Sequence, residues 1–236
     1  MRRWTVVLGL GLAALAIATP AQAGTVTRSG TSLIYQAAVG EQNLLQVRFF
    51  SGTVSISDRY EIAPGAGCAT DPDNATTGCP TSGVTALVLR LGDRNDELKS
   101  VGPALQVDLP RSLKLNVDGG TGKDSLIGTK RNDELTGGSG ADKVYGSGGE
   151  DKLKGGSGND RLTGFGRLDG GSGNDFLEAF YGFAGEKTPH PSTILGGPGN
   201  DHVLTGNKVH DRVNCGAGRD VATTTDKRGF DTFKSC

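Results

Sequence analysis

The stretch GGTGKDSLI GTKRNDELT GGSGADKVY GSGGEDKLK GGSGNDRLT, residues 119–163, repeats one nine-residue pattern five times. Each unit opens with glycine, carries an aspartate at its sixth position and an aliphatic residue at its eighth. Counted onward from the first unit, an aspartate recurs every nine residues, at Asp124, Asp133, Asp142, Asp151, Asp160 and Asp169. A short strand cannot bury one aliphatic side chain by itself, and stacking of neighbouring units supplies the missing partner. The pattern therefore predicts an all-β solenoid of glycine-rich turns and short strands.

The same spacing predicts cation sites in the turns. Calcium is held by six to eight oxygens from carboxylates and backbone carbonyls, at about 2.3–2.6 Å. Glycine lets a turn adopt conformations in which successive carbonyls converge, and the aspartate adds formal charge at the end of the turn. One turn offers too few oxygens, so we expect each site to lie between two turns stacked about 4.8 Å apart.

The units resemble the RTX, or haemolysin-type, calcium-binding repeats of bacterial secreted proteases, lipases and toxins. The resemblance implies a parallel β-roll in which two nonapeptides form one coil, so that alternate repeats share an edge. It thereby implies a strong column of metal ligands through Asp124, Asp142, Asp160 and Asp175, and a weaker one through Asp133, Asp151 and Asp169. The glycines expected to shape the strong sites are Gly120, Gly122, Gly138, Gly140, Gly156, Gly158, Gly171 and Gly173. Asp201 is a further candidate ligand, whereas ordinary turn or cap roles are expected for Asp93, Asp118, Asp211, Asp220 and Asp231.

Weaker repeats flank the strongest block at residues 119–178. An early echo, LGDRNDELK, occupies residues 91–99, and residues 101–118 have the length of two calcium-free units. A truncated unit, GFGRLD, stands at 164–169, an insertion at 179–195, a further repeat at 196–204 and a degenerate unit at 206–214. We therefore expect a β-roll over residues 91–214 and a carboxy-terminal cap over residues 215–236.

The segment before the repeats has a different composition. Residues 24–90 are poorer in glycine and contain runs rich in Val, Ile, Leu and Phe, which predict an amino-terminal all-β region, either a cap or a small domain. Residues 1–23 carry Arg2 and Arg3, an apolar run and a small-residue site ending at Ala23, which is typical of a secretory signal peptide. The apolar run is too short for a comfortable membrane span, so a secreted, extracellular protein is expected.

Charge and cysteine content narrow the class of protein. The chain has 25 basic against 26 acidic side chains, which gives no electrostatic case for binding nucleic acid. An even number of cysteines is consistent with an oxidising compartment. Proximity favours pairing Cys68 with Cys79 and Cys215 with Cys236, although other pairings stay open at this point.

The sequence favours a protein without a catalytic centre. It contains neither H-E-x-x-H nor G-x-S-x-G, so the protease and lipase motifs that often accompany such repeats are missing from it. Our leading interpretation is an exported calcium-binding protein with structural ions, acting as a matrix or envelope component or as a binding module for a cell-envelope glycan or an extracellular protein. Two alternatives stay open: a calcium-dependent adhesin, and a polysaccharide lyase or epimerase that would use a cluster such as Arg161, Arg167 and His190.

Overall fold

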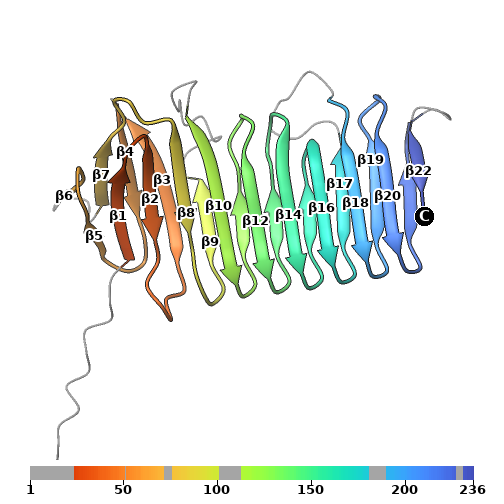
Figure 1. The fold of residues 1–236 in the computed structure, drawn as a ribbon, viewed down its shortest axis with the longest axis horizontal. Helices are drawn as coiled ribbons and strands as arrows, with labels where there is room; N and C mark the ends of the chain where they lie inside the picture. Colours follow the sequence, from red (N-terminus) through yellow and green to blue (C-terminus); the bar gives the residue numbers. More distant parts are fainter. Residues whose placement is uncertain (1–23, 51, 72–75, 101–112, 181–189, 227–230) are drawn as a thin grey trace, which may run out of the picture.

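A computed structural model describes residues 24–50, 52–71, 76–100, 113–180, 190–226 and 231–236. Figure 1 shows the strands stacked along the long axis of the molecule. All regular elements of the described residues are strands, arranged in two sheets of eleven strands each. The prediction of an all-β parallel roll is confirmed. Within the described ranges, no helix is long and apolar enough to cross a membrane.

Three sequence expectations fall on residues outside the described ranges. They concern the secretory leader at 1–23, the greater part of the calcium-free units at 101–118, namely residues 101–112, and residues 181–189 of the insertion. These expectations stay predictions.

Successive strands of the roll alternate between the two sheets. The first sheet contains β8 (Ala86–Arg90), β10 (Lys114–Thr121), β12 (Glu134–Ser139), β14 (Asp151–Ser157), β16 (Gly166–Ser172), β18 (Thr193–Pro198), β20 (Arg212–Ala217) and β22 (Thr232–Lys234). The second contains β9 (Glu97–Ser100), β11 (Ser125–Ile127), β13 (Lys143–Tyr145), β15 (Arg161–Thr163), β17 (Phe176–Phe180), β19 (His202–Gly206) and β21 (Val221–Thr224). All these neighbours pair in parallel, and Leu135 lies beside Leu153 as Val144 lies beside Leu162. Two nonapeptides therefore complete one coil.

The aliphatic residue of each unit builds the core between the two sheets. Leu126, Leu135, Val144, Leu153 and Leu162 are each at most 1% exposed. Complete burial of such a side chain contributes about 1.5–3 kcal/mol, and stacking identical positions provides it without a separate hydrophobic cluster for each coil. Because these residues stack in register, they also set the register of the turns that join the strands.

The amino-terminal strands continue both sheets. Strand β2 (Ser32–Gln36) pairs in parallel with β8, and β3 (Leu44–Phe50) pairs in parallel with β9. Beyond them lie β1 (Gly24–Ser29) and β5 (Ile62–Pro64) on the first sheet, and β4 (Thr53–Ser57), β7 (Thr76–Pro80) and β6 (Ala69–Asp71) on the second. One cluster of buried residues runs from Val26 to Cys215 through both parts. We infer that residues 24–90 act as a cap on the end of the roll, with short strands at its edges.

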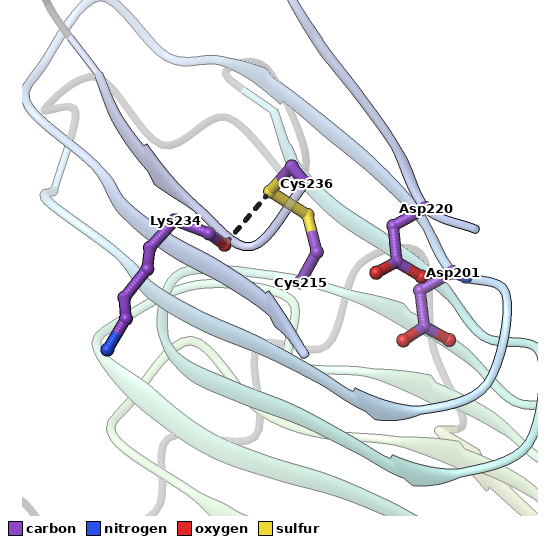
Figure 2. Close-up of a disulfide and its surroundings, with 5 residues drawn as sticks. All are labelled: Asp201, Cys215, Asp220, Lys234 and Cys236. Carbon is purple, nitrogen blue, oxygen red and sulfur yellow. Dashed lines mark hydrogen bonds between the residues drawn. A yellow bond between two sulfur atoms is a disulfide. The ribbon is translucent and has the colours of Figure 1, made fainter. Parts of the chain in front are cut away.

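Disulfides join Cys68 to Cys79 and Cys215 to Cys236, so the local pairing is confirmed. Figure 2 shows the second bond, which ties the end of the chain to β20 close to Asp201 and Asp220. The last strand, β22, needs such a tie because its three residues are all exposed, including Phe233 at 42%.

Candidate metal centre

The strong column expected from the sequence is formed at the edge where first-sheet strands turn into second-sheet strands. The backbone N–H of Asp124 donates to Oδ1 of Asp142 at 2.8 Å, that of Asp142 to Asp160 at 2.8 Å, and that of Asp160 to Asp175 at 2.9 Å. The four carboxylates predicted to share an edge therefore lie at successive levels of one ladder.

This ladder extends beyond the strongest repeats in both directions. The backbone N–H of Asp96 donates to Asp124 at 2.8 Å, that of Asp175 to Asp201 at 2.9 Å, and that of Asp201 to Asp220 at 2.8 Å. We call the seven aspartates from Asp96 to Asp220 the first column. Asp96 was not among the ligands predicted from the sequence, although the weak repeat at residues 91–99 contains it.

Each carboxylate of the first column up to Asp201 uses one oxygen in the ladder and leaves the other without a partner. The Oδ2 atoms that are buried and accept no hydrogen bond belong to Asp96, Asp124, Asp142, Asp160, Asp175 and Asp201. All six residues are 1–2% exposed. Removing a carboxylate oxygen from water without a compensating partner costs several kcal/mol, so this row of oxygens favours either a counter-charge or protonation.

The protonation equilibria of the column reflect the same cost. Burial raises the pKa of Asp124 to about 7, opposed by the hydrogen bond from the Asp96 backbone and reinforced by the charges of Asp142 and Asp96. Burial likewise raises the pKa of Asp160 and of Asp175 to about 6. A column without metal thus resists full ionisation near neutral pH, whereas a divalent cation favours it.

Glycine opens the space that these carboxylates occupy. A methyl group added at Gly137 would lie 2.5 Å from Oδ2 of Asp142, and one at Gly140 would lie 1.5 Å from the carbonyl oxygen of Gly122. Gly140 also has φ of 140°, where a side chain is strained. Positive φ is shared by all the expected site glycines, namely Gly120, Gly122, Gly138, Gly140, Gly156, Gly158, Gly171 and Gly173. Successive turns therefore approach backbone to backbone.

The donor set fits calcium. Among the described residues, no group of three or more His, Cys, Asp or Glu side chains converges on one point. A cation held at this column would be bound by carboxylates of neighbouring levels together with backbone carbonyls and water, which is an all-oxygen set. Hard cations such as calcium take such sets, while zinc prefers nitrogen and sulfur. The residues that would hold calcium are the aspartates from Asp96 to Asp201 with the carbonyls of their turns.

The weaker column is formed only in part. At the opposite edge, the backbone N–H of Asp133 donates to Oδ1 of Asp151 at 2.9 Å, so these two residues stack as predicted. The backbone N–H of Asp151 then donates to the carbonyl oxygen of Phe165, where the next carboxylate was expected. The ladder of aspartates stops there.

The placement of Asp169 in this column was wrong. The register pairs Leu153 with Leu168 and Lys154 with Asp169, so Gly166 takes the level of Asp151. Asp169 instead forms a 3.0 Å ion pair with Arg167, on the outer side of β16. The turn of this unit has lost three residues. Asp169, which occupies the ninth position of its unit, therefore stands nine residues after Asp160, where the aspartate of the sixth position would be expected.

Asp211 is more than the turn residue that we expected. It is 1% exposed, and its Oδ2 is buried without a partner. Its Oδ1 accepts hydrogen bonds from the backbone N–H of Ser192 and from the Asn207 side chain. The second column, defined as the levels of Asp133, Asp151, Gly166, Ser192, Asp211 and Asp231, therefore resumes after its interruption.

The residues considered for an enzyme site are dispersed. Arg161 lies on β15 in an ion pair with Glu178, at 2.8 Å, and its guanidinium lies 4.2 Å from the centroid of the Phe176 ring. Arg167 lies on β16 in the other sheet. His190 contacts Glu150 at 3.1 Å. The structure does not bring these three side chains together.

Comparison with known families identifies the repeats. Residues 118–153, 145–166 and 167–182 match the RTX calcium-binding nonapeptide repeat, in four copies. The recognition made from the sequence is confirmed. Comparisons with curated proteins and with solved structures give no significant match. The matched segments contain the middle of the first column, while Asp96 and Asp201 lie outside them.

Proposed function

We propose, on the premise that residues 118–182 are RTX calcium-binding nonapeptide repeats, that this protein is an exported, non-enzymatic roll whose first column holds a row of structural calcium ions. One observation carries the proposal: six consecutive levels, from Asp96 to Asp201, each bury a carboxylate oxygen that has no partner in the protein. A single site of this kind could be a local defect, whereas six in register indicate a common ligand.

The two oxygens of each first-column carboxylate have different roles. Oδ1 of an aspartate accepts the backbone N–H of the preceding level and fixes the position of the carboxylate, as Asp142 does for Asp124. Oδ2 remains available for a cation, and from Asp124 to Asp201 the glycine five residues earlier leaves room for it. Calcium supplies positive charge that offsets burial and repulsion between levels. Because the site exists only when coils are stacked, binding free energy becomes folding free energy.

Export is supported by the two disulfides, since such bonds persist in oxidising compartments, and by the leader-like composition of residues 1–23. The outer faces of the two sheets offer a surface for a cell-envelope glycan or an extracellular protein, and we propose a matrix or binding role in that setting. Pull-down of purified glycans and envelope fractions, with and without calcium, tests this part.

The calcium role is tested by folding. Far-ultraviolet circular dichroism and thermal unfolding, in chelator and in millimolar calcium, should show a gain of β-structure and a higher midpoint with calcium, and a smaller effect with magnesium. Asp142→Ala should lower the number of ions bound in a calorimetric titration, whereas Asp118→Ala, an exposed residue on β10, should leave it unchanged. Identical spectra and midpoints in chelator and calcium would contradict the proposal.

A further inference from the structure

In the turn at residues 128–133, Thr129 hydrogen-bonds both carboxylate oxygens of Asp133. The backbone N–H of Thr129 donates to Oδ2 of Asp133, and the Thr129 hydroxyl lies 3.0 Å from Oδ2 and 3.1 Å from Oδ1. The hydroxyl in turn accepts the backbone N–H of Arg131 at 3.1 Å. Asp133 is 4% exposed, yet neither of its oxygens is without a partner.

First-column turns have no equivalent of these contacts. The residue that follows the opening glycine is again glycine there, for example Gly120 and Gly138, and both have positive φ. Glycine offers no hydroxyl, and the corresponding carboxylates, Asp124 and Asp142, keep a buried oxygen without a partner. Thr129 therefore supplies a hydroxyl donor that the first-column turns lack.

The positive charge of Arg131 also disfavours a metal ion at Asp133. Burial raises the pKa of Asp133 to about 6, and this rise is opposed by the hydrogen bonds from Thr129 and, to a smaller degree, by the positive charge of Arg131, which lies within the turn. The carboxylate thus already has a cationic neighbour, and that neighbour repels a metal ion.

A second aspartate of this edge is held in a similar way. Oδ2 of Asp231 accepts the hydroxyls of Thr205, at 2.7 Å, and Thr224, at 2.8 Å, while its Oδ1 accepts the backbone N–H of Asp211. Threonine hydroxyls on carboxylates therefore occur twice in the second column.

We propose that Thr129 takes the place of a calcium ion at Asp133, so that the turn at residues 128–133 folds and stays closed without metal. The proposal rests on the calcium role assigned to the first column. It concerns the Asp133 turn alone, because Asp151 and Asp211 each retain an oxygen without a partner. The roll then has a turn that is locked by side chains directly across from turns that require ions.

Counting bound ions tests the proposal. In calorimetric titrations of the full chain with calcium, Asp133→Asn should bind as many ions as the wild type, whereas Asp142→Asn, its first-column counterpart, should bind fewer. Equal losses in the two variants would overturn the inference. If the wild type itself binds no calcium, the proposed function fails, and that outcome is distinct.

The hydroxyl is tested by Thr129→Val, which preserves the shape of the side chain, with Thr129→Ser as the control that retains the donor. In chelator, Thr129→Val should lower the unfolding midpoint by about 3–10 °C, as expected for loss of a buried hydrogen bond to a charged group, and Thr129→Ser should lower it less. In saturating calcium the deficit of Thr129→Val should shrink, since the released carboxylate can then recruit a cation. Equal midpoints for the wild type and Thr129→Val in chelator would refute the role of the hydroxyl, whether or not Asp133→Asn folds.

Discussion

Substituting alanine at Gly140 should cost far more than the same change at Gly40. Both glycines have positive φ, 140° and 84°, so a side chain is strained at both positions, by about 1–2 kcal/mol. Around Gly40 an added methyl group meets nothing within 4 Å, whereas at Gly140 it would lie 1.5 Å from the carbonyl oxygen of Gly122. A relaxed carbon-to-oxygen contact needs about 3.3 Å, so the two turns must separate by roughly 2 Å.

That separation breaks hydrogen bonds between coils. Across the two turns that must separate, the backbone N–H of Gly122 donates to the carbonyl oxygen of Ser139 at 2.8 Å. Each such bond contributes about 1 kcal/mol, and a buried donor left without a partner costs about 1–3 kcal/mol. We therefore expect Gly140→Ala to lower the free energy of unfolding by about 2–4 kcal/mol more than Gly40→Ala does.

Urea unfolding in saturating calcium measures both costs under one condition. Calorimetric titration of the same samples should show fewer bound ions in Gly140→Ala and an unchanged number in Gly40→Ala. If the two variants lose the same free energy and bind the same number of ions, the close approach of successive turns does not govern the stability of the roll.

Three further changes probe other parts of the chain. In chelator, the roll should be more stable at pH 5 than at pH 8. Burial raises the pKa of Asp124 to about 7 and that of Asp151 to about 8, so the folded state keeps protons that the unfolded state releases near pH 4, and the resulting stability is lost as the pH rises through 7 and 8. A thermal midpoint that increases with pH in chelator would contradict this expectation. Arg94→Gly should stabilise the protein by about 1 kcal/mol in urea unfolding, because Arg94 has φ of 83° where the other turns have glycine, and a loss of stability would show that its side chain outweighs the strain. Cys236→Ser should speed hydrogen exchange in the strands that follow Cys215 while leaving the number of bound calcium ions unchanged, and an equally large change in exchange upstream of the bond would argue against a local clamp.

The parallel roll and the middle of the first column could be predicted because one period controls both. Stacking identical aliphatic positions sets the register, and an 18-residue coil then places Asp124 and Asp142 on one edge. Glycine and aspartate spacing alone predicts the wrong position for Asp169, because the buried aliphatic residue sets the register. Asp169 keeps the spacing of nine, yet it follows its buried neighbour, Leu168, by one position, whereas a column aspartate precedes it by two.

The same rule recovers what the sequence reasoning missed. Asp96 and Asp211 stand two residues before Leu98 and Val213, which are both buried, although their turns have lost most of the glycine pattern. The cap at the other end could not be derived in this way. Its pairing of β2 with β8 joins segments some fifty residues apart without a shared motif, so it depends on which edges are left open in three dimensions.

The hydrogen bonds of the first column all point in one direction along the chain. Each level donates its backbone N–H to the carboxylate of the level that follows, from Asp96 as far as Asp220. Cutting the array from its amino-terminal side removes the N–H that holds the first remaining carboxylate, while cutting it from the carboxy-terminal side leaves the backbone N–H of the last remaining turn without its acceptor. The two ends of the array therefore differ, and the disulfide between Cys215 and Cys236 closes the segment that contains the last acceptor, Asp220.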